Sequence, residues 1–277
     1  MPPPRCATVA EVTDVSGDPV GSSHPGSVPP GADPPRRAGG AGETAAGGGP
    51  ESARRRHPAA VAVAEVTAER ALADPPDLPL HLAGAPGTVA IQLRTTLRRV
   101  AVGAGLARDP DLLAAVRALP GLPGLVTSPA GGTFIIGGPG WLGLCAVGVP
   151  PPGAMPLDWM NAALVSWFSA ALARFGVHAV TGRVEGAWCP GFSDIAAGGR
   201  KLIGLGYRVT REWVVMRGVM PVAPIADPDM DMLVACHRLI RVEVVPAAST
   251  SLEEAAARPG LDVARVIEVW RDVRVAA

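Results

Sequence analysis

Two residues in the middle of the chain have the types and the spacing for nucleophilic chemistry. Cys189 lies in an irregular Trp-Cys-Pro-Gly corner, and Lys201 follows the pair Gly198-Gly199 farther along the chain. A hairpin that turns at the two glycines would bring the Lys201 ammonium close to the Cys189 thiol. A cationic neighbour favours the thiolate, which is the nucleophilic form of cysteine. The same ammonium could polarise an acyl carbonyl as negative charge develops on its oxygen.

Lys201 is the only lysine of the chain, and the other 24 basic residues are arginine. Arginine cannot replace a compact ammonium at a tight site, so this lysine points to a specific role. Taken singly, a lone cysteine is most often a small buried side chain, and a lysine after a turn is most often solvated. The two residues together favour the functional interpretation.

The composition excludes several classes of protein. The 277 residues carry 25 basic and 25 acidic side chains, so the chain lacks the basic excess of an electrostatic nucleic-acid binder. Cys6, Cys145, Cys189 and Cys236 form no CxxC pair, which argues against a disulfide framework and favours a cytoplasmic protein with reduced thiols. Cys236-His237 and Cys145 fit no zinc spacing, so we expect no metal site.

The chain divides at about residue 58. Residues 1–57 contain ten prolines and ten glycines without a hydrophobic period, which predicts a disordered tail. Residues 58–277 form the predicted catalytic domain. Residues 130–149 are apolar, but their seven glycines and Pro139 argue against a membrane span. Two buried strands at 133–136 and 142–149 are the better interpretation.

Hydrophobic periodicity and capping residues predict the remaining elements. Asp158 and Gly176 bound the clearest helix, and Ser251 with Glu254 forms a capping box. Helices are expected at 88–104, 109–119, 158–175, 230–240, from 251 and at 262–273; strands at 177–187 and 213–222; and a hairpin at 194–209. Strands and helices do not alternate regularly, so the fold class is α+β, with a mixed or antiparallel sheet flanked by helices.

The segment from Cys189 to Arg208 resembles the signature of the lipoate–protein ligase and octanoyltransferase superfamily. It reads Cys-Pro-Gly-Phe-Ser-Asp at 189–194 and Gly-Gly-Arg-Lys-Leu-Ile-Gly at 198–204. The Gly-Arg-Lys-x-x-Gly core is shared by ligases and transferases, and an opening cysteine is closer to the cysteine-dependent transferases. Upstream, Gly131-Gly132 followed by Gly-Pro-Gly at 138–140 is similar to the family's Gly-Gly strand and turn. The resemblance covers roughly residues 115–277, with a specific part of about 30 residues.

The resemblance implies a catalytic domain of the biotin/lipoate ligase type and a ping-pong acyl transfer. An octanoyl or lipoyl group would pass from a carrier-bound thioester or a lipoyl-lysine amide to Cys189. The acceptor would be a lysine in a lipoyl-accepting domain of a 2-oxoacid dehydrogenase or of a glycine-cleavage protein. Lys201 would contact the acyl carbonyl, and the uncharged strands within 131–149 would help wall an aliphatic tunnel.

The resemblance also implies the substrate-binding residues, which are Gly131, Gly132, Asp194, Gly204 and Arg208. Gly204 falls on one face of the second hairpin strand, where a ligand chain could pass close to the backbone. Asp194 could orient the nucleophile or a substrate amine, or it could stabilise the turn. The transferase needs no cofactor or metal, and no nucleic acid or membrane is expected among its partners.

Two alternatives stay open from the sequence. The first is an ATP-dependent lipoate–protein ligase that uses Lys201 with ATP and Mg²⁺ and without a catalytic cysteine. The second is an inactive homologue that binds a lipoyl domain or an acyl carrier. Thr127-Ser128-Pro129 stands where the family usually has an arginine before the Gly-Gly motif. In ligases this arginine is associated with phosphate or adenylate contacts, so its loss argues most against the ATP-dependent alternative, and departures of this kind favour the inactive homologue.

Overall fold

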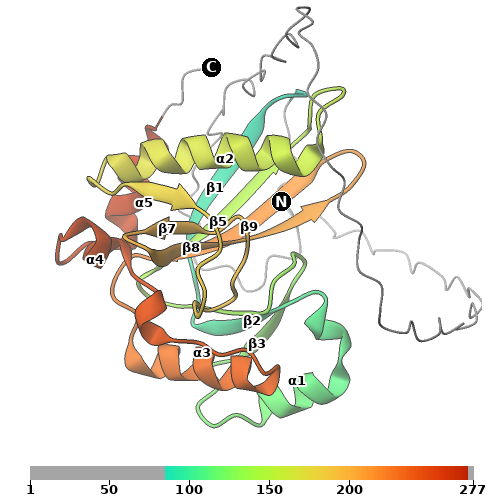
Figure 1. Ribbon diagram of the computed structural model, residues 1–277, viewed down its shortest axis with the longest axis vertical. Helices are drawn as coiled ribbons and strands as arrows, with labels where there is room; N and C mark the ends of the chain where they lie inside the picture. Colours follow the sequence, from blue (N-terminus) through green and yellow to red (C-terminus); the bar gives the residue numbers. More distant parts are fainter. Residues whose placement is uncertain (1–84, 274–277) are drawn as a thin grey trace, which may run out of the picture. The chain divides into compact units, whose positions relative to one another are not determined.

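The structure, a computed structural model, describes residues 85–273 (Figure 1). The predicted tail at 1–57 and the start of the predicted domain at 58–277 lie outside the described residues. A sheet of six strands, here called the large sheet, has the strand order β1-β5-β9-β8-β7-β6, and all its neighbouring strands are antiparallel. Its strands are β1 (Val89–Thr95), β5 (Trp141–Gly148), β6 (Ala179–Thr181), β7 (Ile195–Ala197), β8 (Arg200–Val209) and β9 (Val214–Pro221).

A second sheet, here called the small sheet, has three strands in the order β3-β2-β4. Its strands are β2 (Arg99–Gly103), β3 (Leu125–Ser128) and β4 (Phe134–Gly137). β2 runs parallel to β3 and antiparallel to β4. The fold class is therefore α+β, with an antiparallel large sheet and a mixed small sheet flanked by helices, which confirms the class predicted from the sequence.

The predicted helix at 88–104 is wrong, because this segment forms β1 and β2. Val89, Ile91 and Leu93 are fully buried and alternate along β1, which is the period of a strand. β1 pairs along its whole length with the buried strand β5, and this long-range pairing overrides the local helical pattern. The predicted strand at 177–187 is also shortened to β6, after which the chain enters the irregular loop that carries Cys189.

Two helices cover one face of the large sheet, and Figure 1 shows α2 lying across it. α2 (Pro156–Ala173) and α5 (Val263–Arg271) share one apolar core with the sheet. Trp167 of α2 and Trp270 of α5 meet edge to face, with ring centroids 5.3 Å apart. α2 begins two residues before the prediction, so Asp158 lies in its first turn instead of at the N-cap. Gly176 follows the helix with a φ of +75°.

The small sheet packs with two other helices around a second core. α1 (Pro110–Arg117) is capped by the Asp109 carboxylate, as predicted, and is preceded by a short turn, η2 (Leu106–Arg108). α3 (Asp227–Leu239) packs on β4, and the Arg98–Asp229 ion pair at 2.7 Å ties it to the β1–β2 connection. Trp141 and Trp188 contribute to this core from the large sheet and from the Cys189 loop.

The C-terminal part closes against the start of β8. After η3 (Pro246–Ala248), Ser249 forms a parallel bridge with Lys201. Ser251 and Glu254 form the predicted capping box at the start of α4 (Leu252–Ala256). In the described part of the chain, no helix has the length and apolar character needed to cross a membrane.

Candidate active site

Cys189 lies on the loop between β6 and β7 in a left-handed backbone conformation. Its φ of +44° is uncommon for a residue other than glycine and stores strain at this position. The side chain is half-buried, and its Sγ accepts a hydrogen bond from the Thr133 N–H at 3.1 Å. A Cβ on Gly132 would lie only 2.9 Å from this sulfur, so a glycine is needed beside the thiol. The backbone thus holds one partly accessible thiol against an N–H donor.

Lys201 lies at the start of β8, fully buried beneath the Cys189 loop. Its Nζ donates to the carbonyl oxygens of Trp188, at 2.9 Å, and of Cys189, at 2.6 Å. It also forms an ion pair at 2.7 Å with Oδ2 of Asp194, which is fully buried too. The ammonium lies 4.2 Å from the centroid of the Trp188 ring. The hairpin therefore brings Lys201 to the backbone of Cys189, and the ammonium holds the loop by its hydrogen bonds to the carbonyl oxygens of Trp188 and Cys189.

The three N–H donors of Lys201 are all engaged in this arrangement. Contact between the ammonium and an acyl carbonyl, which the sequence suggested, would require one of these bonds to break. Burial lowers the pKa of the Lys201 ammonium and raises the pKa of the Asp194 carboxyl, while the ion pair between them opposes both shifts. In this arrangement, Lys201 holds the backbone of Cys189 in place through its hydrogen bonds to the carbonyl oxygens.

Asp194 closes the turn that follows Cys189. Its Oδ2 accepts the Gly191 N–H at 2.7 Å, and its Oδ1 accepts the Leu205 N–H at 3.4 Å. The carboxylate thus joins the turn, the Lys201 ammonium and strand β8. Of the two roles considered from the sequence, these contacts match stabilisation of the turn.

His237, on α3, is a member of this cluster that the sequence did not reveal. Its Nδ1 lies 2.7 Å from the Leu233 carbonyl oxygen, which can only accept, so Nδ1 carries the proton. Its Nε2 therefore accepts the Cys189 N–H at 3.0 Å and the Thr133 hydroxyl at 2.8 Å. Burial lowers the pKa of His237, which keeps the ring neutral and its acceptor available. The imidazole thus holds both Cys189 and Thr133, the residue whose N–H donates to the Cys189 sulfur.

Of the predicted glycine positions along β8 and its neighbouring loop, Gly204 is close-packed against the protein itself and Gly131 is not. A Cβ on Gly204 would lie 2.5 Å from the Trp188 ring, so the space beside this strand is filled by an indole and not open to a ligand chain. A Cβ on Gly206 would lie 2.7 Å from the Gly131 carbonyl oxygen. The Gly131 N–H in turn donates to the Tyr207 carbonyl oxygen at 3.4 Å. Gly204 and Gly206 thus allow the loops to approach β8, whereas a Cβ on Gly131 would have room, 4.0 Å from the Tyr207 carbonyl oxygen.

Arg208 is the predicted site residue that the structure places away from Cys189 and Lys201, although its neighbour Tyr207 accepts the Gly131 N–H. It is exposed near the far end of β8, seven residues from Lys201, or roughly 23 Å along an extended strand. Its guanidinium lies 6.0 Å from the centroid of the Trp213 ring. Cys189, Lys201, Asp194, Gly132 and Gly204 are brought together without it.

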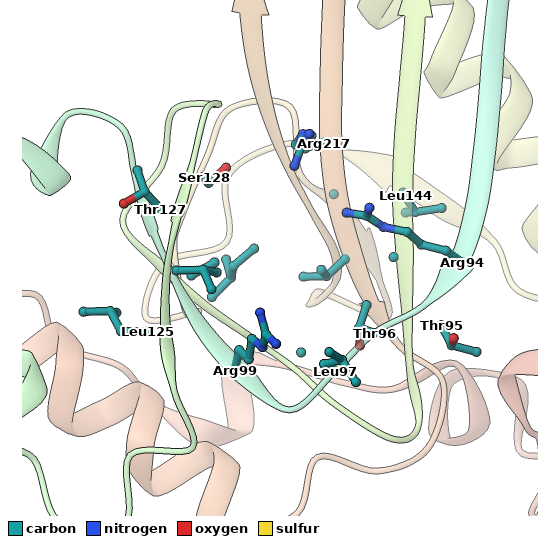
Figure 2. A pocket seen from close by; sticks show the side chains of 17 residues that line it. Arg94, Thr95, Thr96, Leu97, Arg99, Leu125, Thr127, Ser128, Leu144 and Arg217 are labelled. Atoms are coloured by element: carbon teal, nitrogen blue, oxygen red, sulfur yellow. The ribbon is translucent and has the colours of Figure 1, made fainter. Parts of the chain in front are cut away.

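A cavity of about 470 Å³, here called the intersheet cavity, lies between the two sheets (Figure 2). β1, β5 and β9 line it from the large sheet, and all three strands of the small sheet line it from the other side. Cys189 does not line it, but Ile135 does, two residues along the chain from Thr133. Among residues 85–273, no group of three His, Cys, Asp or Glu side chains is arranged to hold a metal ion.

Among known proteins, the chain is similar to solved structures. No family model matches the chain, and no curated protein sequence matches it. Lipoate-protein ligase A bound with ATP is 18% identical, with 66% of this chain and 70% of that chain aligned and a TM-score of 0.48. Protein Ta0514 from T. acidophilum with bound lipoic acid is also 18% identical, over 66% and 69% of the two chains, with a TM-score of 0.47. These distant similarities do not assign the chain to a family.

Proposed function

We propose that the protein is an acyltransferase that carries an octanoyl or lipoyl group as a thioester on Cys189. The observation that carries the proposal is the setting of the sulfur. Cys189 is half-buried in a strained left-handed conformation, and its Sγ accepts the Thr133 N–H. Such a donor stabilises negative charge on sulfur, and the thiolate is the form that attacks a carbonyl. The resemblance of the segment 189–208 to the cysteine-dependent transferases supports the same chemistry.

The reaction has two balanced steps. The Cys189 thiolate attacks the carbonyl carbon of a carrier thioester, the bond from that carbon to the carrier sulfur breaks, and the carrier thiolate leaves and takes up a proton. The amine of an acceptor lysine then attacks the Cys189 thioester. An amide forms as the bond from the acyl carbon to the Cys189 sulfur breaks, and the proton lost by the amine restores the Cys189 thiol. The thioester preserves the energy of the donor for the formation of the amide.

Lys201 and Asp194 are assigned positioning roles in this mechanism. The Lys201 ammonium binds the carbonyl oxygens of Trp188 and of Cys189. The Asp194 carboxylate accepts the Gly191 N–H and so fixes the turn that follows Cys189. A buried ion pair with its hydrogen bonds satisfied is a rigid support for the strained loop.

The partners proposed for the reaction follow from the same motif resemblance. The donor is an octanoyl or lipoyl carrier, and the acceptor is a lysine of a lipoyl-accepting domain in a 2-oxoacid dehydrogenase or a glycine-cleavage protein. The segment 131–149 supplies Ile135, Gly137, Gly143 and Leu144 to the intersheet cavity. Burial of an aliphatic chain contributes about 0.8 kcal/mol per CH₂, so this surface would favour binding of an acyl chain.

The test is intact-mass spectrometry of the full chain after incubation with an octanoyl-loaded acyl carrier protein or an octanoylated lipoyl domain, without ATP. We expect an added octanoyl mass on the wild type and on Cys6→Ala, which keeps the candidate nucleophile. We expect none on Cys189→Ala. An equal adduct on Cys189→Ala, or no adduct on the wild type with either donor, would overturn the mechanism. Transfer to a lipoyl domain that requires ATP and lipoate would establish the ligase alternative instead.

A further inference from the structure

Buried side chains bind both polar groups of the Cys189 backbone. Its carbonyl oxygen accepts from Nζ of Lys201 at 2.6 Å, and its N–H donates to Nε2 of His237 at 3.0 Å. Both side chains are fully buried, and they reach Cys189 from different elements, β8 and α3. A left-handed conformation at a residue other than glycine persists only where its surroundings hold it. His237 and Lys201 together therefore hold the φ of +44° at Cys189.

The orientation of the His237 ring is set within its own helix and by a neighbouring strand. Nδ1 lies 2.7 Å from the Leu233 carbonyl oxygen, one turn earlier in α3. Phe134 of β4 packs against the imidazole edge to face, with ring centroids 5.7 Å apart. Because Nδ1 carries the proton of this bond, Nε2 is the acceptor and faces the Cys189 loop.

The contacts of Nε2 close a ring of three hydrogen bonds. Nε2 accepts the Cys189 N–H and, at 2.8 Å, the Thr133 hydroxyl. The Thr133 N–H in turn donates to Sγ of Cys189 at 3.1 Å. In a closed ring, each bond restricts the geometry of the other two. The N–H that faces the sulfur is therefore placed by the imidazole as well as by the backbone of Thr133.

We propose that His237 is a positioning residue for the chemistry of Cys189. It holds the nucleophile by its N–H as Lys201 holds it by its carbonyl oxygen, and it completes the ring that presents the Thr133 N–H to the sulfur. The proposal rests on the proposed function for its consequence in acyl transfer. Its consequence for the reactivity of the thiol follows from the ring alone.

The role requires an acceptor and not merely a ring-shaped side chain. An apolar ring of similar size would fill the same space in the second core, but it would leave the Cys189 N–H and the Thr133 hydroxyl without their partner. A donor that has lost its partner inside a protein draws the surrounding backbone into a new arrangement or stays unsatisfied. His237→Phe therefore separates positioning from packing, and His237→Gln, whose amide oxygen can accept, is the conservative variant.

The rate at which iodoacetamide alkylates Cys189 at neutral pH tests the ring without any acyl donor. The full chain would carry Cys6→Ala, and Cys145 and Cys236 are buried. We expect His237→Phe to slow alkylation about tenfold or more, because the sulfur loses the donor that stabilises its negative charge. His237→Gln should lie closer to the wild type than to His237→Phe. His178→Gln, which changes an exposed histidine just before β6, should leave the rate unchanged.

A double-mutant cycle tests whether the three bonds act as one unit. Thr133→Val removes the hydroxyl but keeps the N–H, and it should also slow alkylation. In the presence of His237→Phe it should add little, because the ring is already open. Effects that multiply, or a folded His237→Phe variant that is alkylated as fast as the wild type or faster, would overturn the proposal. If circular dichroism shows that His237→Phe is unfolded, the cycle uses His237→Gln, and an unchanged rate for Thr133→Val overturns it.

Acylation by octanoyl-pantetheine then connects the ring to the proposed function. We expect His237→Phe to lower the maximal rate of acylation of Cys189, while the donor concentration at half-maximal rate changes by less than about twofold, since the ring contacts the sulfur and not the donor. An unchanged maximal rate would overturn the positioning role. A wild type that is never acylated, with alkylation rates as expected, would instead overturn the proposed function and leave the role of His237 at the thiol.

Discussion

Replacement of Lys201 by methionine gives the strongest test of how the candidate site is held. The change keeps the volume of the aliphatic stem but removes a fully buried ammonium. Asp194 would then be a buried carboxylate without its cation, and the carbonyl oxygens of Trp188 and Cys189 would lose their donor. Removal of one partner from a buried ion pair costs about 3–5 kcal/mol. We expect Lys201→Met to lower the free energy of unfolding by that amount, measured by urea denaturation of the full chain with circular dichroism.

The loss should depend on pH in a defined direction. Burial raises the pKa of Asp194 above its usual 3.8, and removal of the cation leaves this effect unopposed. The folded variant would then bind a proton at Asp194 more tightly than the unfolded chain does. Its stability deficit should therefore be smallest at low pH and should grow as pH rises through the folded pKa, by up to about 1.4 kcal/mol per pH unit. Lys201→Met should thus lose more stability at pH 8 than at pH 5.

Two further variants decide whether the buried charge is the cause. Lys201→Met/Asp194→Asn removes the isolated carboxylate but keeps an oxygen that can accept the Gly191 N–H, so it should be more stable than Lys201→Met at pH 8. Arg265→Met breaks an exposed pair with Glu268 and should change stability by less than about 1 kcal/mol. A Lys201→Met variant that loses less than about 1 kcal/mol, with no dependence on pH, would refute the assignment of Lys201 as the clamp of the Cys189 loop.

Two other perturbations probe the same cluster. Gly204→Ala would place a Cβ 2.5 Å from the Trp188 ring and should cost about 1–3 kcal/mol in urea denaturation, with an altered rate of Cys189 alkylation; unchanged values for both would show that the indole yields freely. Because burial lowers the pKa of His237, the unfolded chain binds a proton there more readily, so stability should fall as pH drops below the usual 6.5. His237→Gln, which cannot titrate, should flatten the dependence of the urea midpoint between pH 5 and 7, whereas a slope equal to that of the wild type would exclude His237 as its source.

The sequence predicted those parts of the fold that depend on local chemistry. The capping box at Ser251, the cap at Asp109 and the turn at Gly198-Gly199 all have short-range signatures, and all three are confirmed. The helix predicted at 88–104 was wrong because the structure of β1 is decided by its pairing with β5, about 50 residues away. A single sequence holds no local record of such a pairing.

The site was predicted in the same uneven way. The hairpin argument brought Lys201 to Cys189, but it did not show that the ammonium binds the backbone carbonyls instead of pointing to a substrate. His237 lies on a helix whose approach to Cys189 follows from tertiary packing, and nothing in its neighbourhood in the sequence marks it. The lining of the intersheet cavity was hidden for the same reason, because Arg94 and Arg217 line one cavity only when β1 and β9 flank β5.

The wide spacing of the residues around Cys189 also determines when its surroundings form. Thr133 and His237, which meet at the imidazole, are separated by 104 residues. At about 5–20 residues per second, a ribosome needs roughly 5–20 s to synthesise the chain between them. Contacts of this sequence separation also form slowly during folding. The nascent chain therefore carries Cys189 as an ordinary thiol, which acquires its special setting only once α3 has docked.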